Sequence, residues 1–268
     1  MFISFIYWSV LSVERQFRGV NMKLVVEDAP ALKAAIDSIV SLVEEGEFEL
    51  KADGLHLKAM DPSQISMVSF TMPKTAFLEY SVPEETRIGV NMIQLTNVLS
   101  RGKKGEKVEI TMEDGRLVLK FYADKRKKTF KVPLLEASER LQKEPKIEFK
   151  SHVCIKADAL KEALKDAKLV SSHVRLVLDP AQFIVEVRGD SGDIREEFEA
   201  GGSEVLEIKT ESGARATFPL QYLEDMMKAT VSGSAVTLNL ETDKPLKMEY
   251  EIEGAKVTYY LAPRIETE

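Results

Sequence analysis

The sequence predicts an α+β protein made of two copies of one domain, each with mainly antiparallel sheet and two helices. The first observation is an internal repeat with a constant offset: residues 31–36 correspond to residues 159–164, 91–95 to 219–223, and 108–113 to 236–241, each 128 residues apart. The second is that apolar residues recur with helical spacing in a few segments and alternate in many others. A duplication that holds across two helices and a strand in one register indicates two equivalent domains.

Length and composition narrow the class of protein. A chain of 268 residues is long enough for two domains that each bury a core. The formal net charge of −7 argues against a generally basic nucleic-acid binder, so any contact with DNA requires locally clustered lysines. A single cysteine, Cys154, rules out an internal disulfide and fits a reducing cytoplasm. We therefore expect a cytoplasmic protein.

The first 21 residues have no counterpart in the repeat. The apolar stretch Phe2–Val13 is too short to span a bilayer, and it lacks the preceding basic residues and the cleavage site of a signal peptide. We predict that residues 1–21 are an N-terminal extension outside the fold and that Met22 is the natural start. The alternative is a genuine apolar peptide that docks on the protein.

Residues 22–133 form the predicted first domain. A strand over residues 23–27 precedes a helix that begins near Pro30 and ends at Gly46. A hairpin over residues 48–58 turns at Asp53-Gly54. The remaining predicted elements are strands 65–72 and 87–90, helix 91–100, two strands around a turn at residues 113–116, and strand 129–133.

Residues 134–148 lack sustained periodicity and are the predicted interdomain linker. Residues 149–268 form the second domain, with helices predicted at 158–170 and 219–229. Its predicted strands are 149–156, 173–178, 182–188, 194–199, 204–209, 235–241, 246–252 and 256–261.

The segment 157–170 is an amphipathic helix with three faces. Leu160, Ala163, Leu164 and Ala167 make an apolar stripe. The second face is basic, with Lys161, Lys165 and Lys168, and the third is acidic, with Asp158, Glu162 and Asp166. For an isolated helix, a solvated surface with Glu/Lys pairs is the favoured interpretation.

The sequence contains no recognisable catalytic or cofactor-binding pattern, and an enzyme is the weaker class. The three histidines lie at spacings that no metal site favours, and residues 102–105 lack the spacing of a phosphate-binding loop. Asp61-Pro62-Ser63 is better explained as a turn than as a nucleophile site. We predict no catalytic residue, no metal, no cofactor and no membrane partner.

Several collinear segments give the chain a specific resemblance to archaeal and eukaryotic DNA sliding clamps, the proliferating cell nuclear antigen family, from Met22 onward. These segments are residues 57–63 (LKAMDPS), 88–92 (IGVNM), 129–134 (TFKVPL) and 259–266 (YYLAPRIE). The resemblance implies a closed ring of three identical two-domain subunits whose helices line a hole for duplex DNA. Its implied partners are DNA polymerase, clamp loader, nuclease and ligase, which bind through short peptide motifs.

Three groups of site residues follow from the pattern and the resemblance together. The residues expected to face DNA are Lys33, Lys103, Lys104, Lys161, Lys165, Lys168 and Lys228. A head-to-tail ring needs two complementary edges, for which we expect Arg101, Lys103 and Lys128 against Asp158, Glu162 and Asp166. The resemblance places a partner-peptide pocket at Met60, Gln64, Met67, Leu141, Pro145, Ile147, Pro245, Tyr260, Leu261, Ala262 and Pro263.

The leading functional hypothesis is a processivity factor that encircles duplex DNA without sequence preference and tethers replication and repair proteins. The alternative is a ring-forming interaction scaffold, or one subunit of a hetero-oligomeric clamp, that does not itself track DNA. Both expected edge types occur on one chain, which favours a homotrimer.

Overall fold

The computed structural model describes residues 22–136, 142–189 and 192–265, and the predicted extension 1–21 lies outside this range. Its residues fall into two compact units. The first contains residues 22–59, 69–136, 142–143 and 253–256, and the second contains residues 60–68, 144–189, 192–252 and 257–265. No helix in the described part of the chain is both long and apolar enough to cross a membrane.

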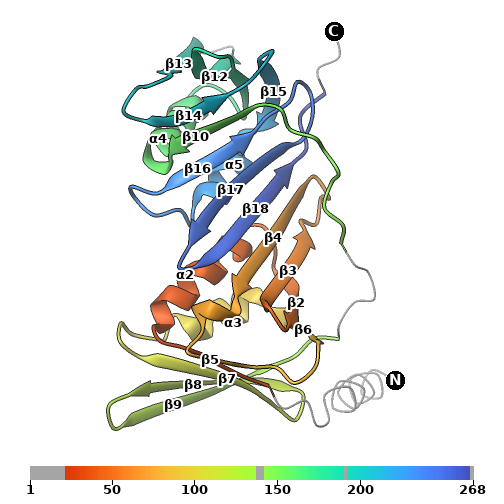
Figure 1. The fold of residues 1–268 in the computed structure, drawn as a ribbon, viewed down its shortest axis with the longest axis vertical. Helices are drawn as coiled ribbons and strands as arrows, with labels where there is room; N and C mark the ends of the chain where they lie inside the picture. The colour runs from red at the N-terminus through yellow and green to blue at the C-terminus, as the bar shows by residue number, and fades with distance from the viewer. Residues whose placement is uncertain (1–21, 137–141, 190–191, 266–268) are drawn as a thin grey trace. The chain divides into compact units, whose positions relative to one another are not determined.

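The first unit combines two helices with antiparallel strands (Figure 1). One sheet has the strand order β5-β1-β7-β8-β9, and β2 pairs with both β3 and β6. Its elements are β1 (Lys23–Val26), α2 (Ala29–Val40), β2 (Glu45–Lys51), β3 (Gly54–Met60), β4 (Ser66–Pro73), the 3₁₀ turn η1 (Lys74–Ala76), β5 (Glu79–Ser81), β6 (Thr86–Asn91), α3 (Met92–Leu99), β7 (Lys107–Glu113), β8 (Arg116–Ala123) and β9 (Arg126–Pro133).

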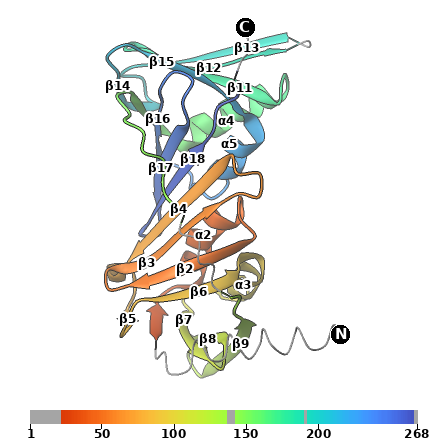
Figure 2. The ribbon, with the colours of Figure 1, turned by 90° about the vertical axis from the view of Figure 1, so that its right-hand side faces the viewer.

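The second unit repeats this succession of strands and helices. One of its sheets has the order β13-β12-β11-β15, and β14, β10, β16 and β17 are neighbours in another. Figure 2 labels the strands of the first of these sheets. Its elements are β10 (His152–Lys156), α4 (Ala157–Lys168), β11 (His173–Leu178), β12 (Gln182–Gly189), β13 (Gly192–Glu199), β14 (Val205–Lys209), β15 (Ala214–Pro219), α5 (Leu220–Met227), β16 (Ala235–Asn239), β17 (Leu246–Ile252) and β18 (Ala255–Leu261). The predicted duplication is therefore confirmed: β1-α2-β2 corresponds to β10-α4-β11, and β6-α3-β7 to β15-α5-β16.

Two details of the first unit differ from the prediction. Helix α2 ends at Val40, and Gly46 lies inside β2 opposite Val90. A side chain at Gly46 would meet Leu57 Cδ1 at 2.7 Å, so close packing rather than helix termination requires glycine there. In the following hairpin Lys51 pairs with Gly54, which makes Ala52 and Asp53 the connecting residues instead of Asp53-Gly54.

Other turns and caps follow directly from local sequence. Asp114 and Gly115, with φ of 48° and 69°, connect the paired residues Glu113 and Arg116 as the Asp-Gly dipeptide predicts. At the start of α3 the Asn91 side chain accepts a hydrogen bond of 2.9 Å from the backbone N–H of Gln94, which satisfies one of the unpaired donors of the first helical turn.

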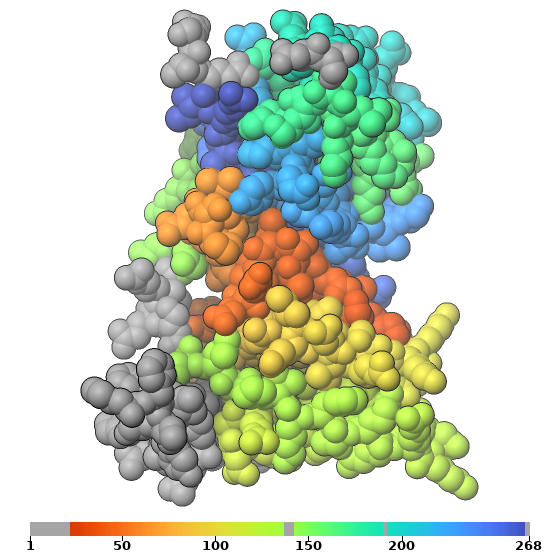
Figure 3. Space-filling view, turned by 180° about the vertical axis from the view of Figure 1, so that it is seen from behind, coloured from red at the N-terminus to blue at the C-terminus, as the bar shows by residue number. Residues whose placement is uncertain are grey.

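In each unit the two helices pack beside one another. Helix α2 contacts α3, and α4 contacts α5. Figure 3 shows both pairs at the molecular surface, α2 and α3 in orange-red and yellow, α4 and α5 in green and blue. The apolar stripe of α4 is fully buried, as its spacing predicts, and the helix packs on β10, β11 and β12. Its charged faces are thereby left for the surface.

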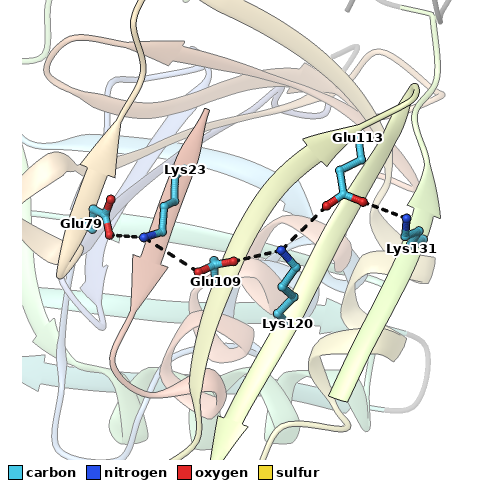
Figure 4. A network of polar contacts seen from close by, with 6 residues as sticks. All are labelled: Lys23, Glu79, Glu109, Glu113, Lys120 and Lys131. Carbon is cyan, nitrogen blue, oxygen red and sulfur yellow. Dashed lines mark hydrogen bonds and ion pairs between the residues drawn. The ribbon is translucent and has the colours of Figure 1, made fainter. Parts of the chain in front are cut away.

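A ladder of alternating charges crosses the sheet of the first unit (Figure 4). Lys23 pairs with Glu79 at 2.6 Å and approaches Glu109 at 3.9 Å. Lys120 continues the ladder, with Glu109 at 3.2 Å and Glu113 at 3.8 Å. Lys131 ends it 2.8 Å from Glu113. Four strands, β1, β7, β8 and β9, and the short edge strand β5 are thus joined by side chains as well as by backbone hydrogen bonds.

Candidate nucleic-acid interface

A groove between α4 and α5 brings together four of the seven lysines predicted to face DNA. The groove has a volume of about 310 Å³ and is lined by Lys161, Leu164, Lys165, Lys168, Gln221, Glu224, Met227 and Lys228. Helix α4 contributes three lysines at i, i+4 and i+7, and Lys228 follows the last turn of α5. The helical period and the packing of the two helices therefore create a basic surface in a chain of negative net charge.

Each groove lysine already has a partner in the free protein. Lys161 Nζ donates a hydrogen bond of 2.7 Å to the backbone carbonyl of Thr230. Lys168 Nζ lies 2.8 Å from Glu224 of α5. Lys165 and Lys228 form ion pairs three residues away in sequence, with Glu162 and Asp225. Such exposed pairs are worth only about 0–1 kcal/mol each, so phosphate oxygens can replace the carboxylates at small cost.

Burial distinguishes one of these lysines from the others. The half-buried position of Lys161 lowers its pKa below the ordinary value of 10.5, and the nearby charge of Lys165 acts in the same direction. The hydrogen bond to Glu162 instead raises the pKa of the exposed Lys165. The groove thus holds one half-buried lysine bonded to the backbone and three exposed lysines paired with carboxylates.

The other predicted DNA-facing lysines belong to the first unit. Lys33 on α2 forms an ion pair with Asp37 one turn along the helix. Lys103 and Lys104 lie exposed in the turn after α3, and neither ammonium has an ion-pair partner among the described residues. Helix α3 itself carries no charged residue. The lysines of this unit that were predicted to face DNA therefore lie on α2 and in the turn after α3, whereas those of the second unit line one groove.

The predicted partner pocket is organised around a buried carboxylate in the turn between β3 and β4. Asp61, only 4% exposed, accepts hydrogen bonds from the backbone N–H groups of Ser63, Ile65 and Ser66 at 2.8, 2.9 and 2.6 Å. The hydroxyl of Tyr222 donates a further bond of 2.9 Å. The Asp-Pro-Ser segment is thus a turn, as predicted, and it fixes the exposed Gln64 in a left-handed conformation with φ of 59°.

Several predicted pocket residues lie next to this turn. The backbone N–H of Ala262 donates a bond of 2.8 Å to the Ile65 carbonyl, which joins the C-terminal segment to the turn. The hydroxyl of Tyr260 donates a hydrogen bond of 3.0 Å to the Glu144 carboxylate. The pKa of this phenol is raised, mainly by burial and secondly by the neighbouring Glu144 carboxylate. The predicted positions Met67, Tyr260 and Leu261 are buried, Met60, Ile147, Pro245, Ala262 and Pro263 are half-buried, and Gln64 and Pro145 are exposed. Leu141 lies outside the described residues.

The residues predicted for the subunit interface make contacts within their own units. Lys128 Nζ lies 2.7 Å from Glu106 and donates to the Arg101 carbonyl. Asp158 accepts 2.8 Å hydrogen bonds from the Gly233 N–H and the Ser232 hydroxyl, which lower its pKa in that order. Lys103 and Arg101 are exposed in the turn after α3, and Glu162 and Asp166 are exposed on α4.

Sequence reasoning missed two open sheet edges of opposite charge. Strand β9 ends one sheet of the first unit and carries four basic and no acidic residues, namely Arg126, Lys127, Lys128 and Lys131. Strand β13 ends one sheet of the second unit and carries four acidic residues and one basic residue, namely Asp193, Glu196, Glu197, Glu199 and Arg195. The signal in the sequence was the run of like charge in each strand, but only the strand order reveals that both are edges.

Carboxylates repel one another at the acidic edge strand β13. Partial burial raises the pKa of Glu196, and the carboxylates of Asp166, Glu204 and Glu162 raise it further. Glu196 thereby connects β13 to the acidic face of α4. Within the described residues, no three His, Cys, Asp or Glu side chains are grouped as metal ligands would be.

Comparison with known proteins agrees with this architecture. The family model for the N-terminal domain of proliferating cell nuclear antigen matches residues 21–138, and the model for its C-terminal domain matches residues 143–265. A DNA polymerase sliding clamp of Methanococcus maripaludis is 36% identical over 241 residues, covering 88% of this chain and 96% of the relative.

Solved structures show the same fold. The proliferating cell nuclear antigen of Thermococcus kodakaraensis matches with a TM-score of 0.86 and 23% identity, over 91% of this chain and all of that one. That of A. fulgidus, solved with the C-terminal region of FEN-1 bound, matches with a TM-score of 0.83 and 30% identity, over 92% of this chain and all of that one. With both domains matched and the duplicated fold in place, the chain belongs to the proliferating cell nuclear antigen family of DNA polymerase sliding clamps.

Proposed function

We propose that three copies of this chain close head to tail into a ring around duplex DNA and hold replication proteins there, with no catalytic turnover of their own. The observation that carries the proposal is the pair of oppositely charged open edges, β9 and β13, on one chain. Unpaired strand edges invite pairing with another chain. A heterologous interface between two different edges generates a ring when the rotation closes.

All but one of the residues predicted for the subunit interface lie on or near β9 or β13. Glu162 and Asp166 surround Glu196 and add negative charge beside β13. Lys128 lies in β9. The exposed Arg101 and Lys103 lie in the turn after α3, and helix α3 contacts β9. Asp158 has a different role in the proposal, because its carboxylate is occupied by the loop at Ser232 and Gly233. A neighbour's basic edge would relieve the repulsion around Glu196.

The lysine groove of α4 and α5 supports DNA contact that permits movement. Phosphate contacts position a protein without reading sequence. Because Lys165, Lys168 and Lys228 would exchange weak carboxylate pairs for phosphates, each of these contacts is weak and screened by salt. Lys33, Lys103 and Lys104 would add to this surface from the first unit. Such contacts suit a protein that is held on DNA by ring closure and slides along it.

The turn at Asp61 and the segment after Tyr260 support binding of a partner peptide. The bound C-terminal region of FEN-1 in the A. fulgidus relative is a precedent for a nuclease partner. The relatives from Methanococcus maripaludis and Pyrobaculum aerophilum are DNA polymerase sliding clamps, which points to DNA polymerase as a partner. Clamp loader and ligase are further partners that we propose to use the same pocket, through Gln64, Met67 and the backbone near Ala262.

Primer extension on a primed circular template tests the proposal. Addition of the chain to an archaeal DNA polymerase should lengthen the products of a single binding event. The triple variant Lys161→Ala, Lys165→Ala, Lys168→Ala should shorten the products again. Its DNA binding should also depend less on salt: in a plot of the logarithm of the binding constant against the logarithm of the salt concentration, the slope should fall in magnitude by roughly 0.9 for each lost phosphate contact. A matched variant with Lys74, Lys107 and Lys209 changed to Ala, which are exposed lysines outside both the groove and the predicted partner pocket, should behave as wild type. Equal product lengths for all three proteins would contradict the proposed role of the groove.

A further inference from the structure

A second basic cavity lies in the second unit, away from the helix groove. It has a volume of about 220 Å³ and is lined by Ser171, His173, Arg175, Glu186, Val187, Arg188, Thr217 and Arg264. Its floor is the sheet β12-β11-β15, in which Arg175 pairs directly with Glu186 on one side and Thr217 on the other. Because side chains alternate along a strand, His173, Arg175, Glu186 and Arg188 share one face. Three guanidinium groups thus border a single cavity.

The charges around the cavity do not cancel. Glu186 is the one carboxylate in the lining, and it is shared between Arg175 at 3.8 Å and Arg195 at 3.0 Å. Arg175 also donates to the Thr217 hydroxyl at 3.4 Å, which holds its guanidinium over the sheet. Arg188 and Arg264 are exposed, and within the described residues neither pairs with a carboxylate. An anion in the cavity would therefore meet two uncommitted guanidinium groups and a third fixed by its neighbours.

The C-terminal segment that carries Arg264 borders the cavity and is held in place by a backbone hydrogen bond. The N–H of Arg264 donates a bond of 2.7 Å to the Thr217 carbonyl, which anchors the C-terminal segment along the edge strand β15. Burial, and then the charge of Arg264, lowers the pKa of His173, so its imidazole is neutral at pH 7 and offers an N–H donor without a carboxylate partner. The Ser171 hydroxyl lies at the same rim.

From this arrangement we infer that the cavity is a binding site for a phosphate group, either as free phosphate or pyrophosphate or as the phosphate of a mononucleotide. Planar guanidinium forks match the paired oxygens of phosphate. Several of them around one cavity, set against a single shared carboxylate, favour a dianion over a single carboxylate ligand. The site is distinct from the proposed DNA groove and does not depend on the function proposed for it.

A titration of the full chain, followed through the imidazole resonances of its three histidines, tests this inference. Sodium phosphate, sodium pyrophosphate and dAMP are each added at ionic strength held constant with sodium chloride. We expect a saturable shift of the His173 resonances and a rise in the His173 pKa, because a bound dianion favours the charged imidazole. His56 and His152 lie outside the cavity and serve as internal controls, with unchanged resonances.

Variants connect the shift to the arginines. Arg188→Gln and Arg264→Gln should each weaken binding about tenfold or more. Arg215→Gln removes an exposed arginine from the same strand as Thr217 but outside the cavity, and it should bind as wild type. Binding of phosphate and pyrophosphate would assign the site to the phosphate group alone, whereas binding of dAMP only would assign it to a nucleotide. A His173 shift that does not saturate, or that Arg215→Gln alters as much as Arg188→Gln does, would overturn the inference.

Discussion

At the scale of single residues, Asp158 was predicted for the subunit interface, but its carboxylate makes hydrogen bonds within its own unit. Asp158 lies in the first turn of α4 and receives two hydrogen bonds from the loop that precedes β16. Its pKa is lowered from the ordinary 3.8 by the Gly233 N–H and then by the Ser232 hydroxyl. The carboxylate therefore stabilises the folded chain only while it is ionised.

This linkage gives a signed pH dependence. Asp158→Ala should lower the melting temperature at pH 7, because the Gly233 N–H loses its acceptor. Since the folded-state pKa lies below the unfolded value, the stabilisation is fully present above about pH 4 and is lost as pH falls through the lowered folded pKa. Thermal unfolding from pH 7 to pH 2 should show the wild-type and variant curves converging in acid. Glu251→Ala, which removes an exposed carboxylate with no ion pair among the described residues, is the control. A pH-independent difference between Asp158→Ala and the wild type would contradict this explanation.

Residues of the proposed partner pocket make a second prediction. A peptide of the pattern Gln-x-x-aliphatic-x-x-aromatic-aromatic should bind with micromolar affinity in a calorimetric titration. Gln64→Ala and Met60→Ala change exposed and half-buried side chains at the Asp61 turn, and each should weaken binding several-fold with little effect on folding. His56→Gln, on β3 and before the turn, should bind normally. Equal affinity for all four proteins would place the peptide site elsewhere.

At the scale of elements, the ladder of ion pairs joins the strands of the first sheet. Glu109 occupies its centre, between Lys23 and Lys120, and its side chain is 17% exposed. The hydrogen bond to Glu109 raises the pKa of Lys120. A connected series of charges can contribute where isolated surface pairs do not, especially at high temperature.

Removal of the central charge should therefore matter more than removal of an isolated one. Glu109→Gln should lower the free energy of unfolding by roughly 0.5–1 kcal/mol, with the loss shrinking in 1 M salt. The exposed Glu251, which has no ion pair among the described residues, provides the control variant Glu251→Gln. Denaturant titrations at low and high salt make the comparison, and a loss that persists unchanged in 1 M salt would mean that packing rather than charge is responsible.

Some elements of the fold could be predicted from local sequence, and others could not. The helices α4 and α5 and the Asp114-Gly115 turn follow from periodicity, the constant repeat offset and local turn chemistry, which are properties of neighbouring residues. Local sequence predicts a helix end at Gly46, whereas the actual constraint on this residue is the approach of Leu57 from another strand, which local sequence does not show. In the same way Lys168 meets Glu224 across 56 residues, which no local pattern specifies. The lysine groove could thus be predicted as a set of residues but not as a set of ion pairs.

At the scale of the whole molecule, ring formation depends on which strand edges of neighbouring chains pair with one another. The basic strand β9 and the acidic strand β13 are each an open edge, and like charges along either strand disfavour pairing of an edge with its own kind. Opposite edges attract one another. This pattern favours head-to-tail association of identical chains over a symmetric dimer.

The charges of the two edges can be reversed separately. Arg126→Glu with Lys127→Glu reverses part of β9, and Glu197→Lys with Glu199→Lys reverses part of β13; all four side chains are exposed. Either pair of changes should shift the protein toward monomer, because the altered edge then repels its normal counterpart. All four changes together restore opposite charges and should restore the assembly. Glu84→Lys with Glu85→Lys, between β5 and β6, is a matched reversal outside both edges.

The most direct test of the central claim is the mass in solution, measured by size-exclusion chromatography with light scattering at low micromolar concentration. The account predicts a single species of three times the chain mass of 30.1 kDa for the wild type, the control and the four-residue variant, and a shift to 30.1 kDa for either edge variant. A wild-type protein of one or two chain masses, or a trimer that both edge variants retain, would contradict it.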